Sequence, residues 1–345
     1  MGCMKIVNKR ESLFLPPSSS VERILVWHQG ALGDLLLAGP ALAAISRRYP
    51  QARLTGVGHP ERWGLLASTL PLAAVWDGGE ALWAHLFTEA PIPKKLRQRL
   101  APFQLALVFS PGIRPGFLAR LGQAGIPSVH WIPSFPEDTR EPVAALQARH
   151  LRGWGLKVAP QPFRLKVDQA LVDGVPELPP GPWVAVAPGS GHPLKNWPLG
   201  HYYEVTRALA WQQQMGVVWL LGPGEAALFP YLRPLAASQG HVLLSLLPLA
   251  RVAAVLSRCR LYLGGDSGLT HLAAAVGVPA VLALFGPTDP QVWAPQGAGV
   301  KILTGPCSSA PCAQGREISC PAPQCLEDLA PQTVLAEAVA LLRSG

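Results

Sequence analysis

The chain has 345 residues, of which 49% are hydrophobic and only 14% are charged. This composition excludes an intrinsically disordered protein, and the length suffices for two domains that each bury a core. The net charge of +8 is unevenly distributed, because residues 1–165 contain 19 Lys and Arg against 10 Asp and Glu, whereas residues 166–345 contain 10 against 11. We therefore expect the first half to meet an anionic partner.

No apolar run reaches the roughly 20 residues that span a bilayer. The longest run, residues 272–285, is interrupted by Gly277 and Pro279. Residues 1–20 lack an apolar core of signal-peptide length and are interpreted as a flexible tail. We predict a cytoplasmic protein that touches a membrane surface.

The first predicted strand, residues 23–28, leads into Gly-Ala-Leu-Gly-Asp at 30–34 and then an apolar helix to about residue 48. The dinucleotide spacing G-x-G-x-x-G is absent. Asp34 is the only acid between Glu22 and Glu61, and it follows a strand whose carboxyl end is where ligands bind in open α/β sheets. It either caps the helix or acts as a base facing a cleft.

Strands and helices alternate through the rest of the first half, which predicts right-handed crossovers and a parallel sheet. The strands are expected at 53–57, 105–109 and 128–132, and the helices near 116–122 and 141–154. Residues 61–68 and 80–100 are interpreted as helical or irregular. The densest basic run is either a solvated helix face or an anion-binding patch, and it consists of Lys94, Lys95, Arg97 and Arg99.

The second half begins with a buried strand at 183–187, after a Pro-rich linker that ends near residue 182. The loop PGSGHPLKNWP at 188–198 contains glycines and Ser190, which suit the wrapping of phosphate oxygens by backbone N–H groups. Lys195 is the only cation between Lys166 and Arg207, so it is a natural counter-charge for a diphosphate. The P-loop pattern is missing.

A helix at 199–213 and strands at 217–221 and 241–244 are expected next. Glu225 follows the first of these strands. It is placed either to accept hydrogen bonds from ribose hydroxyls or to act as an acid in a first helical turn. A helix is expected at 249–257.

The segment GGDSGLTH at 264–271 lies between a strand at 260–263 and a helix at 268–276. The first turn of such a helix attracts a phosphate or carboxylate. Ser267 adds a hydroxyl donor, and Gly268 is expected to let a ligand approach the backbone. His271 shares the helix face of Ser267, or else is a satisfied core histidine. A strand at 280–285, a loop at 286–290 and a final helix near 332–342 follow.

Four cysteines lie within nineteen residues with the spacing C-x4-C-x7-C-x4-C, at Cys307, Cys312, Cys320 and Cys325. Zinc sites usually show two-residue gaps, and disulfides are not expected in the cytosol. We expect a structural loop of thiols, with a metal or redox site as the alternative.

Four motifs occur in order: GALGD at 30–34, PGSGHPLKNWP at 188–198, GGDSGLTH at 264–271 and LFGPTDP at 284–290. Together they make residues 21–343 resemble the heptosyltransferases of glycosyltransferase family 9, which build the inner core of lipopolysaccharide. The resemblance implies an α/β GT-B fold, with two Rossmann-like domains whose parallel sheets face a central cleft. The implied domains are a tail at 1–20, an acceptor domain at 21–165, a linker at 166–182, a nucleotide-sugar domain at 183–327, and a helix at 328–345 that packs back towards the first domain.

The resemblance also implies an inverting transfer of heptose from ADP-heptose without metal or cofactor, at the inner face of the inner membrane and with no nucleic acid as partner. Asp34 matches the family's base, and Lys195 joins it as the second catalytic candidate. The implied donor-binding residues are Ser190, Gly191, Lys195, Glu225, Asp266, Ser267, Gly268, Leu269 and His271. Acceptor binding is assigned to Gly33 and to the basic run Lys94, Lys95, Arg97 and Arg99.

The chain departs from the family at His28 and Gln29, where members often have an Arg, which leaves acceptor contacts there open. Three alternatives remain. The first is a related GT-B transferase with another nucleotide sugar or acceptor. The second is a nicotinamide-dependent oxidoreductase, which the incomplete dinucleotide motif disfavours. The third is a nucleotide-binding protein without catalysis.

Overall fold

The computed structural model describes residues 15–136, 140–158, 162–175, 178–314, 317–318 and 320–344. Contacts divide the chain into two compact units. The first unit comprises residues 1–30, 38–137 and 143–161, and the second comprises 31–37, 138–142 and 162–345. In the described part of the chain, no helix is both long enough and apolar enough to cross a membrane.

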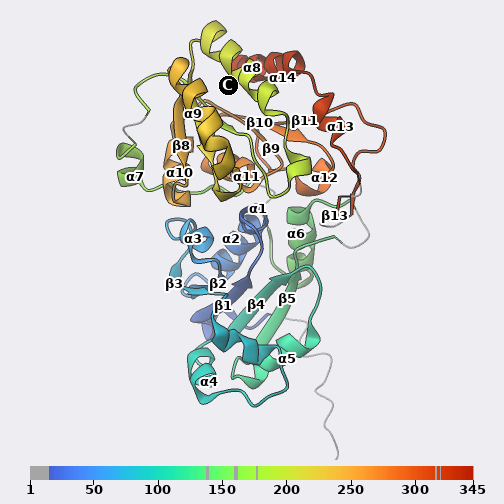
Figure 1. Cartoon of the computed structure of the whole chain (residues 1–345). Helices are drawn as coiled ribbons and strands as arrows, with labels where there is room; N and C mark the ends of the chain where they lie inside the picture. Colours follow the sequence, from blue (N-terminus) through green and yellow to red (C-terminus); the bar gives the residue numbers. More distant parts are fainter. Residues whose placement is uncertain are drawn as a thin grey trace, which may run out of the picture. The chain divides into compact units, whose positions relative to one another are not determined.

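The first unit contains a five-stranded sheet in which every strand pair is parallel (Figure 1). Its central strands are almost continuously buried, as expected for a parallel sheet that is covered on both faces. The strand order is β3 (Leu72–Asp77), β2 (Arg53–Gly58), β1 (Arg23–His28), β4 (Leu105–Ser110) and β5 (Ser128–Pro133).

Both faces of this sheet are covered. On one face, Trp27 packs with Trp83 and Phe117 in a core that also includes Leu96. This core is supplied by η3 (Ala81–Leu86), α4 (Lys94–Leu100) and α5 (Pro115–Gln123). Two further helices, α2 (Gly39–Arg48) and α6 (Val143–Gly153), pack on each other, and α6 also contacts β5.

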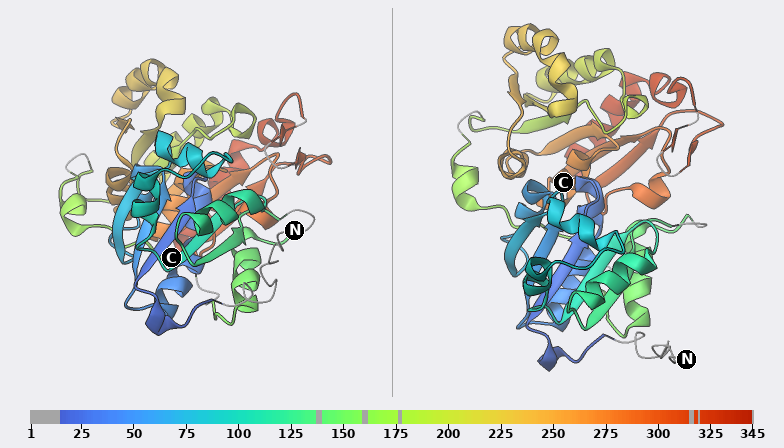
Figure 2. Two further views of the ribbon diagram at one scale, coloured as in Figure 1. Left: turned by 90° about the horizontal axis from the view of Figure 1, so that it is seen from below. Right: turned by 60° about the horizontal axis from the view of Figure 1, so that its bottom comes forward.

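The second unit contains a six-stranded parallel sheet, seen from two further directions in Figure 2. The strand order is β11 (Val300–Thr304), β10 (Ala280–Phe285), β9 (Leu261–Gly265), β6 (Trp183–Ala187), β7 (Gly216–Leu221) and β8 (Val242–Ser245). The order reverses between β6 and β9. In a doubly wound sheet, loops at such a switch point form the ligand site.

Alternate residues of these strands face opposite helix layers. One layer consists of α8 (Leu199–Gln212), α9 (Phe229–Ser238) and α14 (Pro331–Ser344). The other contains α10 (Leu249–Ser257) and α11 (Gly268–Val276), which pack on each other. The short helix α1 (Leu32–Leu37) packs on α11 and therefore belongs with the second unit.

The remaining elements are short. They are η2 (Ser18–Ser20), α3 (Pro60–Gly64), α7 (Gln169–Asp173), η4 (Pro193–Lys195), η5 (Pro223–Leu228), α12 (Pro290–Trp293), β12 (Ala313–Gln314), β13 (Glu317–Ile318) and α13 (Gln324–Glu327).

The predicted alternation is confirmed, and four elements of the second half have the predicted bounds: β6, β10, α10 and α11. Two strands of the large sheets were missed, β3 and β11, as was the short pair β12 and β13. β3 and β11 lie at sheet edges and are only half-buried. In β11 the apolar run is interrupted by Lys301, whereas β3 begins with five apolar residues that the prediction did not use. The single helix expected up to residue 48 is two helices, and Pro40 lies in the first turn of the second one, α2.

Two further observations bear on the predicted domains, whose boundaries remain predictions. Residues 31–37 group with the second unit, although the prediction assigned them to a domain at 21–165. The main packing of α14 is against α8 and β10, whereas the prediction had this helix pack back towards the first domain. Val334 and Ala338 of α14 are apolar and belong to the hydrophobic core of the second unit, which accounts for that packing.

Candidate functional site

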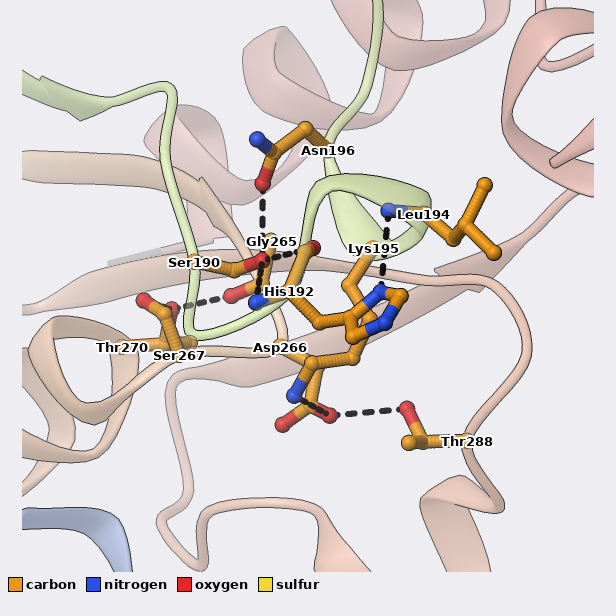
Figure 3. A network of polar contacts seen from close by, with 10 residues as sticks. All are labelled: Ser190, His192, Leu194, Lys195, Asn196, Gly265, Asp266, Ser267, Thr270 and Thr288. Atoms are coloured by element: carbon orange, nitrogen blue, oxygen red, sulfur yellow. Dashed lines mark hydrogen bonds and ion pairs between the residues drawn. The ribbon is translucent and has the colours of Figure 1, made fainter. Parts of the chain in front are cut away.

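Two loops of the second unit meet at the switch point of its sheet. The loop after β6 contains Lys195, and Asp266 directly follows β9. Lys195 Nζ lies 2.9 Å from Asp266 Oδ2 (Figure 3), and their side chains are only 19% and 10% exposed. Such a pair is screened from water much more than a surface ion pair, so breaking it leaves a poorly solvated charge. The ion pair joins the two loops that were predicted to bind a diphosphate.

The loop after β6 is held together by its own polar side chains. Ser190 Oγ lies 2.7 Å from Asn196 Oδ1 and 2.8 Å from the carbonyl oxygen of His192. His192 Nδ1 accepts the N–H of Leu194 over 3.2 Å, at the start of η4. A Cβ at Gly191 would meet nothing within 4 Å, so this part of the loop is open. Ser190 and Lys195 are thus held in a compact turn with an open glycine between them.

Glu225 lies against the beginning of this loop. Its Oε2 accepts the N–H of Gly222 over 2.9 Å, which is the interaction expected of an acid in a first helical turn. A Cβ built on Gly189 would lie 2.0 Å from Glu225 Oε1. Glycine is therefore required at position 189 to admit the carboxylate next to the predicted phosphate loop.

The glycines of the segment 264–271 are required by close packing. A Cβ on Gly264 would lie 2.4 Å from the hydroxyl of Tyr262, and one on Gly265 would lie 3.0 Å from the carbonyl oxygen of Lys195. A Cβ on Gly268 would lie 2.9 Å from the Cβ of Leu32 in α1. The close approach at Gly268 is therefore made by α1, whereas the prediction reserved it for a ligand.

The hydroxyls near the start of α11 form a second polar chain. Tyr262 is buried, and its hydroxyl lies 3.1 Å from Thr270 Oγ1, which in turn lies 3.3 Å from Ser267 Oγ. Burial raises the pKa of Tyr262 to about 12, so the phenol is neutral at physiological pH. Ser267 is the N-cap of α11, yet its side chain does not cap the helix. Leu269 follows, half-buried, in the first turn.

Helix α1 brings Asp34 to the same unit. Asp34 Oδ2 accepts the N–H of Ala31 over 2.9 Å, so the carboxylate does cap the helix, as one of the two interpretations held. Next to it, a Cβ on Gly33 would lie 2.9 Å from Cδ2 of His271. Glycine at position 33 thus lets α1 settle directly on the imidazole in α11.

His271 is 7% exposed and links the charged groups electrostatically. Burial lowers its pKa, while the carboxylates of Asp266 and Asp34 act in the opposite direction and Lys195 acts in the same direction as burial. All three charges therefore lie within electrostatic reach of one imidazole. The arrangement places a cation and a helix N-terminus, which suit an anion, close to a carboxylate that suits a proton acceptor.

A family model described as glycosyltransferase family 9 (heptosyltransferase) matches residues 145–325, more than half of the chain. The chain belongs to glycosyltransferase family 9. It is therefore a glycosyltransferase, as predicted, and its two parallel sheets confirm the predicted α/β class with two Rossmann-like domains.

Individual relatives agree with the family. The chain is 25% identical over 313 residues to lipopolysaccharide heptosyltransferase 1 of Pseudomonas aeruginosa. The aligned residues cover 84% of this chain and 86% of that protein. A family 9 glycosyltransferase of Veillonella parvula has a similar structure, with a TM-score of 0.75 at 17% identity over 94% of this chain and 98% of that one. Heptosyltransferase WaaC of Escherichia coli with ADP has a TM-score of 0.66 at 19% identity over 92% and 99%. The two structural likenesses support the fold.

The basic run of this family 9 enzyme lies in α4 of the first unit, and its members differ in environment. Lys94, Lys95 and Arg97 are exposed. Arg99 binds Glu80 through two hydrogen bonds of 2.5 and 2.9 Å, and its guanidinium lies 4.0 Å from the ring of Trp76. Arg99 is thus engaged in the fold of its own unit, which the sequence run did not reveal.

The four clustered cysteines are thiols in this structure, and among the described residues no group of three or more His, Cys, Asp or Glu could hold a metal ion. Burial raises the pKa of the Cys325 thiol to about 11, and the three other clustered cysteines act in the same direction by charge repulsion. Cys307 packs against the core cluster that contains Cys325. The thiols therefore lie near one another, and a structural role for their segment stays a prediction.

Sequence reasoning missed Thr288, although it noted the loop containing it. The Thr288 hydroxyl donates to Asp266 Oδ2 over 2.7 Å. The available signal was its position in GPTDP, directly after the buried strand β10 and at the same sheet edge as the two loops above. Without coordinates, nothing distinguished this threonine from an ordinary turn residue.

Proposed function

We propose that this family 9 enzyme transfers heptose from ADP-heptose to the inner core of lipopolysaccharide, with inversion and without a divalent metal. The observation that supports this most directly is the ion pair of Lys195 and Asp266, which joins two loops at the switch point of the sheet. Asp34 lies within electrostatic reach of His271, as do both members of this pair. Relatives named lipopolysaccharide heptosyltransferases 1 and 2 favour this acceptor. A structural neighbour, heptosyltransferase WaaC of Escherichia coli solved with ADP-2-deoxy-2-fluoro heptose, favours this donor.

The donor is held by the second unit in this proposal. Lys195 and Ser190 bind the diphosphate, together with backbone N–H groups around Gly191 and in the first turn of α11 at Ser267, Gly268 and Leu269. Glu225 accepts hydrogen bonds from the ribose, and Asp266 and His271 complete the pocket. The diphosphate gains negative charge as it leaves, so fixed donors around it bind the transition state more strongly than the substrate.

Asp34 serves as the base. The oxygen of the acceptor hydroxyl attacks the anomeric carbon of heptose and forms the new glycosidic bond. The bond from that carbon to the diphosphate oxygen breaks, and ADP departs with the electron pair from the opposite face. The acceptor proton passes to the Asp34 carboxylate, a transfer that typically contributes a hundredfold or more.

The acceptor is anionic and approaches the first unit. The exposed Lys94, Lys95 and Arg97 of α4 supply the positive charge, and Gly33 lies beside the base. We place the enzyme in the cytoplasm, in transient contact with the inner membrane whose lipid bears the acceptor. The surplus of positive charge in residues 1–165 supports this assignment.

The test is incubation of the purified enzyme with ADP-heptose and a set of truncated lipopolysaccharides, with and without EDTA, followed by mass spectrometry. A product heavier by one heptose, formed equally in EDTA, is expected. Absence of that mass with every acceptor would contradict the proposal, and loss of product in EDTA would contradict metal independence.

The family assignment leaves one main alternative, a related transferase with another nucleotide sugar or acceptor. Thermal-shift measurements with ADP, UDP, GDP and NAD test the nucleotide, and the transfer assay tests the acceptor and catalysis. Stabilisation by ADP alone is expected, whereas stabilisation by UDP or GDP would favour this alternative.

A further inference from the structure

Thr288 lies in the loop that follows β10 and joins the ion pair from a third side. Its hydroxyl donates to the Asp266 oxygen that Lys195 Nζ also approaches, over 2.7 and 2.9 Å (Figure 3). Thr288 is 9% exposed. A chain of three side chains therefore connects the loops after β6, β9 and β10 at one edge of the sheet.

We propose that Thr288 is a positioning residue for Lys195, acting through Asp266; this inference rests on the proposed function. A lysine side chain has four rotatable bonds, so binding a phosphate costs it conformational entropy unless its amine is already held. Thr288 fixes the carboxylate, and the carboxylate fixes the amine. The ammonium has three donors, and the bond to Asp266 uses one of them, so two remain for a diphosphate.

Thr288 is itself held by the cysteine-bearing segment. The carbonyl oxygen of Pro287 accepts the N–H groups of Cys312 and Ala313, each over 2.9 Å. A Cβ on Gly286 would lie 2.7 Å from Cγ of Leu326, so the loop is packed closely on that side as well. The loop has little freedom to shift, and Thr288 therefore sets the position of Asp266 and does not simply follow it.

A purely structural role for Thr288 makes a different prediction. If its hydroxyl only satisfied a buried carboxylate, its loss would lower stability and weaken every ligand of the site alike. If it positions Lys195, its loss weakens only ligands that have phosphates. Adenosine and ADP differ in that respect, so their affinities distinguish the two roles.

The experiment is calorimetry, which measures the affinities for ADP and for adenosine of four proteins: the wild type, Thr288→Val, Thr288→Ser and Thr206→Val. We expect Thr288→Val to weaken ADP binding about tenfold, roughly the side-chain entropy that a lysine freed from Asp266 would lose on binding a phosphate, and to leave adenosine within about twofold. Thr288→Ser should restore ADP binding. Thr206 is the matched control, because it is a buried threonine whose hydroxyl donates to the carbonyl oxygen of Tyr203 in α8.

A double-mutant cycle with Lys195→Ala completes the test, since coupled residues are not additive. In the Lys195→Ala background, Thr288→Val should change ADP affinity less than about twofold. An equal loss in both backgrounds, or a parallel loss of adenosine, would overturn the inference. If Thr288→Val does not fold, Thr288→Ala against Thr288→Ser makes the same comparison.

The wild type separates this inference from the function on which it rests. Tight ADP binding by the wild type together with unchanged binding by Thr288→Val would overturn the inference alone. A wild type that binds no ADP would overturn the proposed function, and the inference with it. In the transfer assay, Thr288→Val should raise the KM for donor and leave the KM for acceptor unchanged.

Discussion

At the scale of a residue, Asp34 has one role that the structure shows, the helix cap, and one that we propose, the base. Its carboxylate caps α1 by accepting the N–H of Ala31, and it also lies within electrostatic reach of His271. A capping carboxylate at a helix N-terminus is stabilised in its charged form, which a base must have before the reaction. The cap is therefore compatible with the proposed catalytic role.

Asparagine at position 34 separates the cap from the base. Asp34→Asn keeps an oxygen that accepts the Ala31 N–H but cannot take a proton, so we expect turnover to fall at least about a hundredfold while ADP affinity and melting temperature stay close to wild type. Turnover is measured by product mass, and ADP affinity by calorimetry. Normal turnover in Asp34→Asn would leave Asp34 as a cap only.

At the scale of elements, the contact between α1 and α11 depends on two glycines. Gly33 makes room for His271, and Gly268 makes room for Leu32. A methyl group added at either glycine would displace α1, because packed interiors have few voids that could accommodate it. The location of Asp34 is thus decided by sterics at its neighbour.

We expect Gly33→Ala to cost about 1–3 kcal/mol of stability, because its Cβ would lie 2.9 Å from the His271 ring, and to lower turnover by displacing Asp34. Gly200→Ala in α8 is the matched control. Nothing lies within 4 Å of its Cβ, so it should be neutral or stabilising by up to about 1 kcal/mol. Urea unfolding and the transfer assay measure both variants; equal stability of the two would show that α1 adapts.

The basic residues of α4 are expected to have two different functions, depending on whether they are exposed or paired within their own unit. Replacing Lys94, Lys95 and Arg97 together by Gln should raise the KM for the anionic acceptor several-fold at low salt and leave ADP binding unchanged, because these side chains are exposed. Arg99→Gln should instead lower stability, since Arg99 pairs with Glu80 and stacks on Trp76. An unchanged acceptor KM in the triple variant would contradict the acceptor role of α4.

At the scale of the whole molecule, stability should depend on pH through a buried histidine of the first unit. Burial lowers the pKa of His130 to about 4, and nearby His150 contributes. The unfolded chain binds this proton near pH 6.5, whereas the folded chain does not bind it until about pH 4. Stability associated with His130 is therefore complete above pH 6.5 and is lost as pH falls towards 4.

We expect the wild type to lose about 2 kcal/mol more stability than His130→Gln between pH 7 and pH 5, as measured by urea unfolding at each pH. The comparison uses the difference between the two pH values, so any constant cost of the substitution cancels. His59→Gln is the control, because His59 is exposed. A wild-type loss equal to that of His130→Gln would show that His130 is protonated in the folded state.

The sequence by itself determined the order of elements wherever apolar runs are continuous, as in β6, β10 and α11, because strands buried on both faces need such runs. It also identified the loops with Lys195 and Asp266, since parallel strands place their carboxyl ends at one edge. It missed the half-exposed edge strands β3 and β11; in β11 Lys301 interrupts the apolar run, whereas the apolar run of β3 was present in the sequence and was not used.

Only the tertiary structure decided which groups meet. Lys195 pairs with Asp266, and Thr288 bonds to the same carboxylate, although the three residues are far apart in the chain. Arg99 pairs with Glu80, whereas the sequence pattern treats it like the other basic residues of its run. The placement of α1 on α11 depends on the missing side chains of Gly33 and Gly268. Hydrophobic periodicity specifies elements and their buried faces, but contacts between polar groups depend on distances that only packing sets.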